Sequence, residues 1–215
     1  QRSVNNLVDI TNLVMLETGQ PLHAYDSSRL EQPSAQAFSL RAARPGETLL
    51  LLDGEDRELS CDNLLVTNAD QPIALAGVMG GETSSVHEGT TTVWLEAAVF
   101  SPPRIRRSSR AAGLRSESSA RFERGVPEAL TLRAADRAVA LIQELCGASV
   151  EGRWCAGGAA VDQAPVVLRR LALDRLLGPI QDSEGQESAI ADDVVAEILQ
   201  RLGCHVEADL DSDGQ

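Results

Sequence analysis

The chain has 215 residues, 43% of them apolar, and a formal net charge of −13. This length and apolar content are sufficient for a buried core, and the negative charge argues against a protein that binds nucleic acid over its whole surface. No segment reaches the roughly 20 apolar residues of a membrane span. The four cysteines are dispersed without a C-x-x-C pair, so neither a zinc site nor a disulfide framework is indicated, and we expect a reduced, cytosolic protein. The start at Gln1 and the polar end "DLDSDGQ" suggest a segment of a longer protein.

The first predicted element is an amphipathic helix over residues 3–17, which begins after a Ser3 cap. Gly19 and Pro21 are expected to end it. His23 follows, between this Gly-Gln-Pro break and an Ala-Tyr-Asp turn. A histidine at such a position is a solvated loop residue, a half-buried imidazole with its hydrogen bonds satisfied, or a group that positions a substrate.

Segments that predict strands come next, and segments that predict helices follow them. The segments are "FSLRAA", "ETLLLLDGEDREL" with a hairpin signal at Asp53-Gly54, "NLLVTNADQPIALAG" and "TTTVWLEAAVF". From Ser101 onward the pattern is helical, and "EALTLRAADRAVALIQELCG" predicts an amphipathic helix closed by Gly147. Strands followed by helices predict an α+β fold with a mixed, largely antiparallel sheet and packed helices.

A change of composition at residues 155–165 predicts a linker between two domains. Beyond it, "VVLRRLALDRLLG" predicts a strand, a turn and a helix, and "DDVVAEILQRLGCHVEADL" predicts a helix and a strand. We therefore expect one domain over residues 1–160 and a partial, small α/β unit over residues 165–215.

Several familiar catalytic motifs are missing. The segment "GVMGG" has the spacing of neither a dinucleotide-binding loop nor a P-loop, and the chain contains no lysine. A G-x-S-x-G nucleophile elbow is also absent. We therefore expect no serine nucleophile and no bound nucleotide, and we interpret "GVMGG" as the wall of a pocket.

Glu96 is an isolated carboxylate in the apolar segment "VWLEAAVF". Strand alternation places Trp94, Glu96, Ala98 and Phe100 on one face, so Glu96 lies among aromatic and small side chains and requires a partner. A structural glutamate satisfied by backbone N–H groups or by an arginine is the simpler interpretation. A residue of a binding site is the alternative.

The basic residues are unevenly distributed. Residues 104–124 contain seven arginines, opposed only by Glu117 and Glu123. Arginine side chains suit phosphate groups, so one local contact with an anion is possible. A solvated helix face with intramolecular ion pairs explains the pattern equally well.

Four segments together resemble the editing domain of the β subunit of bacterial-type phenylalanyl-tRNA synthetase. They are "NNLVDITNLVMLETGQPLHAYD", "IALAGVMGG", "VWLEAAVF" and "RIRRSSRAAGLRSESSARFERGVPE", and they occur in the order of that family. Residues 165–209 resemble the opening half of the small domain that follows it. The resemblance implies a site that hydrolyses tyrosine attached by mistake to phenylalanine tRNA.

The resemblance also implies the residues and partners of that site. His23 and Glu96 match the catalytic positions, and Thr11, Asn12, Ala76 and Gly77 match the substrate pocket. It implies no metal or cofactor in this fragment, whereas the parent enzyme uses ATP and magnesium and pairs the β subunit with an α subunit in an α2β2 assembly. The parent enzyme's catalytic module is not among the matching segments.

The chemistry of these residues agrees with such a site. Glu96 can accept a hydrogen bond from a phenol, and phenylalanine in the same place would leave that carboxylate unpaired. His23 can orient or partly deprotonate water, and backbone N–H groups near Gly77 can stabilise an oxyanion, although hydrolysis assisted by the substrate's ribose hydroxyl would need no protein base. A module that only binds aromatic amino acids or the tRNA end, or a scaffold of the synthetase, remains the alternative.

Overall fold

The computed structural model describes residues 3–157, 165–181 and 185–208. Contacts between Cα atoms divide the chain into unit 1, Gln1–Ala160, and unit 2, Val161–Gln215, and each is described by itself. The described part of unit 1 has an α+β fold with four α-helices and eight strands, and every strand pairing there is antiparallel. The helices are α1 (Asn6–Thr18), α2 (Pro102–Ala111), α3 (Glu117–Phe122) and α4 (Glu128–Cys146). The strands are β1 (Leu22–Asp26), β2 (Phe38–Ala42), β3 (Thr48–Leu50), β4 (Asp56–Glu58), β5 (Leu64–Asn68), β6 (Gln71–Leu75), β7 (Met79–Gly80) and β8 (Val93–Ala97).

Helix α1 begins three residues later than the sequence predicts. The cap is Asn5, whose side chain accepts a hydrogen bond from the Val8 N–H, whereas the Ser3 hydroxyl donates to the carboxylate of Asp9. The prediction of a Ser3 cap was therefore wrong. The end of α1 agrees with the prediction, because Gly19 adopts the left-handed conformation and its N–H donates to the Met15 carbonyl.

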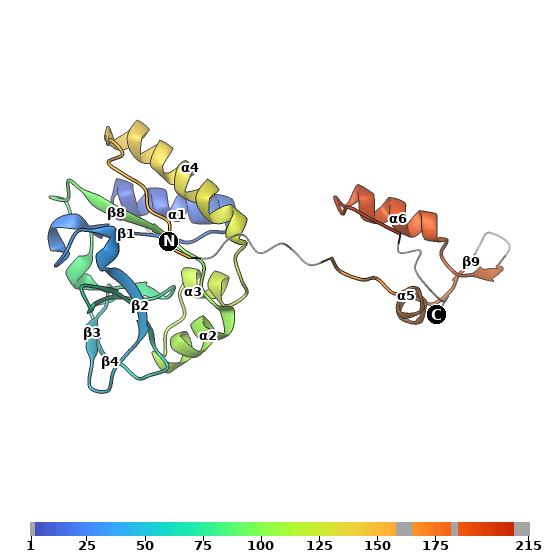
Figure 1. Cartoon of the computed structure of the whole chain (residues 1–215), viewed down its shortest axis with the longest axis horizontal. Helices are drawn as coiled ribbons and strands as arrows, with labels where there is room; N and C mark the ends of the chain where they lie inside the picture. Colours follow the sequence, from blue (N-terminus) through green and yellow to red (C-terminus); the bar gives the residue numbers. More distant parts are fainter. Residues whose placement is uncertain (1–2, 158–164, 182–184, 209–215) are drawn as a thin grey trace. The chain divides into compact units, whose positions relative to one another are not determined.

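Strands β1 and β8 form a two-stranded ribbon that joins distant parts of the sequence, and α1 and α4 lie side by side next to it (Figure 1). One face of the ribbon contributes Leu22 and Leu95 to an apolar cluster that is centred on Ile10 and Val14 of α1 and on side chains of α4. Its other face contributes Tyr25 and Trp94 to the larger core cluster. The predicted alternation is confirmed over Val93–Ala97, where β8 ends, whereas residues 98–100 are not part of the strand.

The larger cluster is enclosed by a four-stranded sheet of order β2-β5-β6-β7, by the β3-β4 hairpin and by α2 and α3. The hairpin predicted at Asp53-Gly54 is confirmed as the β3-β4 connection. Strands β6 and β7 form another hairpin. Its turn is Ala76–Val78, which includes the first two residues of "GVMGG". Gly77 has φ of +66° there, and a Cβ on it would lie 3.0 Å from side-chain atoms of Ile105, Phe100 and Phe122. A larger residue here would be strained in its backbone and would require these side chains to shift.

Unit 2 consists, in its described part, of helices α5 (Arg170–Leu177) and α6 (Asp192–Arg201) and an antiparallel pair of short strands, β9 (Ile180–Gln181) and β10 (Glu187–Ser188). Both helices agree with the prediction. The strand expected at the start of "VVLRRLALDRLLG" is absent, because residues 165–169 form no ladder. Most of the linker expected at 155–165 lies outside the described residues, as does the end of the last predicted strand.

None of the helices among the described residues has both the length and the apolar character to cross a membrane. The cysteines are free and exposed, and no group of three metal-binding side chains was found in the described part of the chain.

Candidate functional site

His23 lies in strand β1, not between a chain break and a turn as the sequence suggested. The preceding residues hold this strand in place. Gln20 is fully buried, and its side-chain amide donates hydrogen bonds to the carbonyls of Pro21 and, at 2.9 Å, Ala98. The connection between α1 and β1 is thereby tied to the end of β8, which fixes the position of His23 in the ribbon.

His23 and Glu96 are direct cross-strand partners. The antiparallel register places His23 opposite Glu96 and Tyr25 opposite Trp94, so all four side chains project from the same face of the ribbon. The two residues that the sequence assigned to catalysis, 73 positions apart, are thus neighbours.

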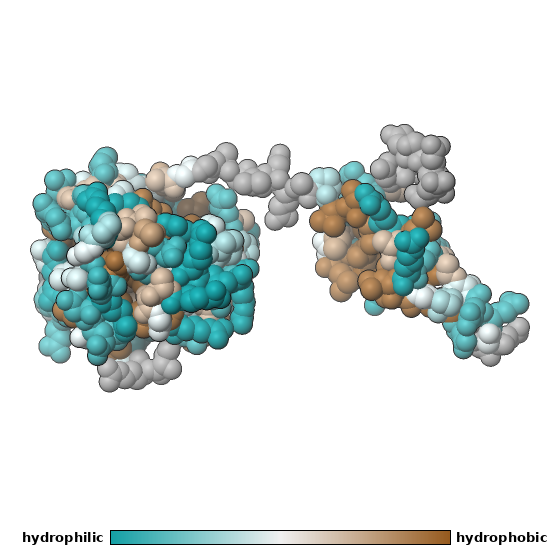
Figure 2. All heavy atoms as spheres, turned by 90° about the horizontal axis from the view of Figure 1, so that it is seen from below, coloured by the Kyte–Doolittle hydropathy of each residue, from teal (hydrophilic) through white to brown (hydrophobic). Residues whose placement is uncertain are grey.

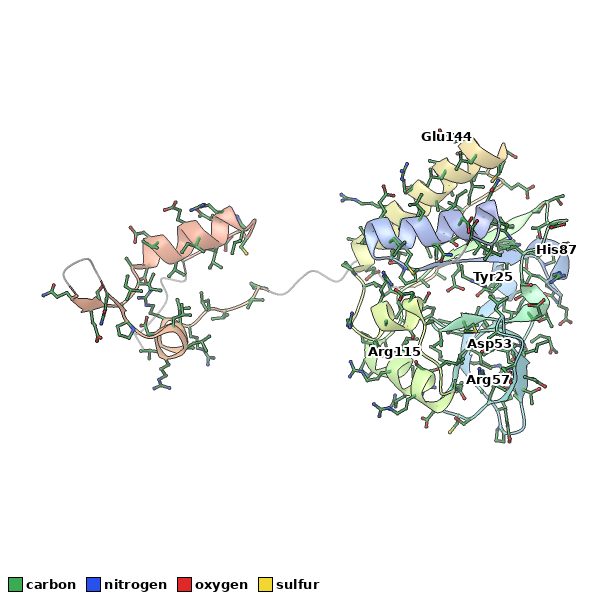
Figure 3. All side chains as sticks on the ribbon, turned by 180° about the vertical axis from the view of Figure 1, so that it is seen from behind. Tyr25, Asp53, Arg57, His87, Arg115 and Glu144 are labelled. Carbon is green, nitrogen blue, oxygen red and sulfur yellow. The ribbon has the colours of Figure 1, made fainter. Side chains whose placement is uncertain are left out.

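The partner of Glu96 is Tyr25. The phenol of Tyr25, whose residue is 1% exposed, donates a 2.5 Å hydrogen bond to Glu96 Oε2. The suggestion that backbone N–H groups or an arginine would satisfy this carboxylate was wrong. Figure 3 shows Tyr25 within unit 1.

The His23 ring is held between Tyr25 and Gly80. Its ring is edge-on to that of Tyr25, with centroids 4.6 Å apart. A Cβ on Gly80 would lie 2.4 Å from His23 Cε1 and 2.6 Å from Nε2, so only glycine fits beneath the ring. Nε2 is buried and has no hydrogen-bond partner among the described residues. The segment "GVMGG" is therefore in contact with His23 through Gly80.

The pKa values follow from this burial. Burial lowers the pKa of His23 to about 4, so its imidazole is neutral at pH 7. Burial raises the pKa of Glu96, and the hydrogen bond from Tyr25 partly opposes that shift. Burial, followed by the adjacent Glu96 carboxylate, raises the pKa of Tyr25 well above its usual range. The phenol consequently keeps its proton and remains a donor.

The remaining four candidate residues are placed less directly. Ala76 and Gly77 belong to the β6-β7 turn, four and three residues before the Gly80 that touches His23. Thr11 is buried in α1, where its hydroxyl donates to the Val8 carbonyl. Because α1 packs on the opposite face of the ribbon from Glu96, a cavity shared by Thr11, Asn12 and Glu96 would have to open around an edge of the ribbon. Convergence of all six residues stays a prediction.

Two hollows on unit 1 lie elsewhere. One of about 620 Å³ is lined by residues 115–117, 120, 121 and 124 of the α3 region. Another, of about 450 Å³, is lined mainly by residues 28–31, 48–50 and 71–73. None of the six candidate residues lines either hollow.

Tyr25, Gly80 and Gln20 are the residues of this arrangement that the sequence did not reveal as important. Tyr25 could have been found by treating "LHAYD" as a strand, since residues two apart on a strand share a face. Gly80 carried no separate signal, because its neighbour is 57 positions away in the sequence.

Comparison with known proteins places the chain in a family. The model of the B3/4 domain matches residues 1–147, and the chain belongs to this family. It is similar to the proteins named phenylalanine–tRNA ligase beta subunit of Parasynechococcus marenigrum strain WH8102 (49% identity over 205 residues, 93% of this chain and 25% of the relative) and of Thermosynechococcus vestitus (48% over 216 residues, 95% and 26%). The beta subunit of Synechococcus sp. strain JA-2-3B'a(2-13) is 50% identical over 207 residues, 94% of this chain and 24% of the relative.

The resemblance noted in the sequence is therefore confirmed. The chain spans about a quarter of the length of the curated relatives that it matches.

Proposed function

We propose that unit 1 is an editing domain that hydrolyses tyrosine mistakenly attached to phenylalanine tRNA, as part of the β subunit of a phenylalanine–tRNA ligase. Residues 165–215 are the start of the small domain that follows in that subunit. The parent enzyme joins an α subunit in an α2β2 assembly and uses ATP and magnesium to make aminoacyl-tRNA. We expect ester hydrolysis by this fragment to require neither ATP nor magnesium. The family match and the names of the relatives support this assignment.

The observation that carries the proposal is the hydrogen bond from a phenol to Glu96. The Tyr25 hydroxyl lies 2.5 Å from Glu96 Oε2, so the carboxylate already has the environment that phenol recognition requires. A carboxylate has lone pairs on both oxygens and can accept from two donors. Oε1 is the acceptor we assign to the phenol of a bound tyrosine.

Discrimination against phenylalanine follows from the same geometry. Phenylalanine has no hydroxyl, so its ring would exclude water from Oε1 without supplying a donor. An unsatisfied buried charged acceptor costs about 1–3 kcal/mol or more. Sites that hydrogen-bond a substrate hydroxyl can reject the analogue without it by a factor of roughly 10⁴. We assign Thr11, Asn12, Ala76 and Gly77 to the walls around the tyrosine and its ester.

His23 is better suited to orient water than to remove a proton from it. An efficient general base has a pKa near the working pH, whereas burial lowers the pKa of His23 to about 4. The neutral ring can still hold water or the ester by a hydrogen bond, which at the buried Nε2 requires the contact with Gly80 to open. We assign stabilisation of the developing oxyanion to the backbone N–H of Gly77, because the N–H groups of Ala76 and Val78 already donate to the Leu64 and Leu75 carbonyls.

The test is the release of tyrosine from mischarged phenylalanine tRNA by the 215-residue chain. We expect release of tyrosine, little release of phenylalanine, and loss of most activity in a His23→Ala variant. The alternative function, a module that binds aromatic amino acids or the tRNA end without turnover, predicts calorimetric binding of tyrosine with no hydrolysis. That result would replace the editing proposal.

A further inference from the structure

Helices α2 and α3 carry a basic surface on an otherwise acidic chain. We define this basic surface as Arg106, Arg107, Arg110, Arg115, Arg121 and Arg124. Residues 104–124 hold seven arginines and two glutamates, a net charge of +5 (7 − 2), whereas the rest of the chain has 12 arginines and 30 acidic residues, a net charge of −18 (12 − 30). Figure 2 views the molecule from the side of α2, where strongly hydrophilic residues gather on unit 1.

The fold of α2 explains why its arginines face solvent. Ile105, Ser108 and Ser109 are buried, while Arg107 and Arg110, three residues apart, are exposed on the opposite side of the helix. The buried serines anchor this inner side, because the Ser108 hydroxyl accepts a hydrogen bond from the Leu64 N–H at 3.1 Å. The outer face of α2 therefore presents arginines to solvent.

Half of the basic surface is not used inside the protein. Arg121 pairs with Glu117 at 2.7 Å, Arg106 donates to the Glu123 carbonyl, and Arg115 reaches the Glu123 carboxylate at 3.4 Å. The side chains of Arg107, Arg110 and Arg124 are exposed and make no hydrogen bond or ion pair with the described residues. Their guanidinium groups are available to an external anion.

The surface also contains a concave portion. The hollow of about 620 Å³ is lined by Arg115, Arg121 and Arg124, together with Ser116, Glu117 and Ala120. Three arginines around one hollow favour a multiply charged anion such as a phosphate chain.

Helix α3 links this surface to the candidate site. The Ser116 hydroxyl, at the start of α3, donates a 2.6 Å hydrogen bond to the Val78 carbonyl in the β6-β7 turn. Phe122 of the same helix lies against Gly77. Two residues after Val78, Gly80 contacts His23. One side of α3 thus contacts the hairpin that covers His23, and its other side carries arginines.

We propose that the basic surface binds the sugar-phosphate backbone of the tRNA acceptor end and thereby directs the aminoacylated terminus to the site at His23 and Glu96. This inference rests on the proposed function and adds to it the contact surface for RNA. Backbone phosphates explain why arginines gather here in a chain of net charge −13. The acidic remainder repels RNA from the other faces, so it favours one orientation.

The test compares two triple variants with the same net charge. Arg107→Ala/Arg110→Ala/Arg124→Ala removes the unpaired arginines of the basic surface. Arg133→Ala/Arg175→Ala/Arg201→Ala removes three exposed arginines elsewhere, which also have no hydrogen bond or ion pair to the described residues. Binding of fluorescein-labelled, uncharged phenylalanine tRNA is measured by anisotropy at a series of salt concentrations.

We expect the basic-surface variant to raise the Kd at least about tenfold and to reduce the salt slope by about 1 for each phosphate that it no longer neutralises, while the control variant changes little. The variant Arg107→Lys/Arg110→Lys/Arg124→Lys should restore a large part of the affinity, because it keeps the charge. Equal losses in both alanine variants, or no loss in either, would overturn the proposal. So would displacement of the tRNA by polyglutamate as readily as by unlabelled tRNA.

A substrate without phosphates separates this proposal from the proposed function. The tyrosyl ester of adenosine contains the ester bond that is hydrolysed but lacks the phosphate backbone of RNA. If the basic surface acts only on RNA, its alanine variant should hydrolyse this ester at the unmodified rate and mischarged tRNA with a raised KM. A chain that binds tRNA through these arginines but hydrolyses neither substrate would contradict the editing function. It would still support RNA binding by the basic surface. Hydrolysis of both substrates by the alanine variant with unchanged KM would support the editing function and contradict RNA binding by the basic surface.

Discussion

The contact between Tyr25 and Glu96 is the most informative feature at the scale of single residues. It was not predicted, because the sequence suggested a turn at Tyr25 and the strand register that brings it to Glu96 is a long-range property. The sequence did predict that Glu96 needs a partner. Which partner it has depends on the pairing of β1 with β8, which no local pattern in either segment encodes.

A double-mutant cycle measures this contact. Tyr25→Phe leaves Glu96 without its donor among the described residues, so we expect a loss of about 1–3 kcal/mol in the free energy of unfolding. Tyr25→Phe in a Glu96→Gln background should cost less, with a coupling energy of about 0.5–3 kcal/mol by urea denaturation. Additive effects would show that the hydrogen bond contributes nothing to stability.

The pH dependence of stability tests the burial of His23. Its folded pKa of about 4 lies below the ordinary value of 6.5, so the unfolded chain binds the proton more readily between these values. Stability should therefore be complete above pH 6.5 and fall as the pH drops toward 4, by at most roughly 3 kcal/mol from this group. Glu96 acts in the opposite direction, since its raised pKa removes stability as the pH rises.

The difference between two variants isolates the contribution of His23. Urea denaturation at about pH 7 and about pH 4.5 should show a smaller pH effect in His23→Gln than in the unmodified chain. His205→Gln serves as the control, because the His205 side chain is 88% exposed in unit 2. An equal pH effect in the unmodified chain and His23→Gln would contradict a depressed pKa.

At the scale of elements, the β6-β7 hairpin fixes the position of the His23 ring. A Gly80→Ala change places a Cβ within 2.6 Å of two ring atoms, so the ring or the strand must move. We expect a loss of about 1–3 kcal/mol in stability and a strong decrease in hydrolysis.

Gly89 provides a matched control for that substitution. A Cβ there would lie 2.8 Å from Cε1 of His87, whose side chain is 44% exposed, so a shift of this ring disturbs only its hydrogen bond from the Gly89 N–H and its 3.2 Å contact with Asp26. Gly89→Ala should therefore cost less stability than Gly80→Ala and should leave hydrolysis unchanged. Thermal unfolding measures the stability of both variants. Similar losses of stability in Gly80→Ala and Gly89→Ala would contradict the role of Gly80 in holding His23.

The elements that sequence reasoning predicted well are those with strong local signals. Helix α4 ends at Gly147 as predicted, because glycine in the left-handed conformation is a local requirement. The hairpin at Asp53-Gly54 has a similar origin. By contrast, the strand expected after residue 165 does not form, and β1 was interpreted as a turn, because short apolar runs do not distinguish strands from irregular chain.

At the scale of the whole molecule, the internal packing of unit 1 predicts that it is independent of unit 2. The boundary falls at Ala160, and Trp154 still belongs to unit 1, where its ring lies 5.2 Å from that of Trp94. A chain that ends at Ala160 should keep the unfolding temperature of unit 1 and its rate of tyrosine release. A chain that ends before Trp154 should be less stable, since it lacks that ring pair. Failure of the chain ending at Ala160 to fold, seen by circular dichroism, would show that unit 2 is required.

The central claim is that Glu96 recognises the phenol of a tyrosine esterified to tRNA. Its most direct test is the ratio of hydrolysis rates for tyrosine and phenylalanine on phenylalanine tRNA, measured for the unmodified chain and for Glu96→Ala under the same conditions. We predict a strong preference for tyrosine in the unmodified chain that falls by at least about tenfold in Glu96→Ala, because the penalty against phenylalanine is removed. An unchanged ratio in Glu96→Ala would contradict the account.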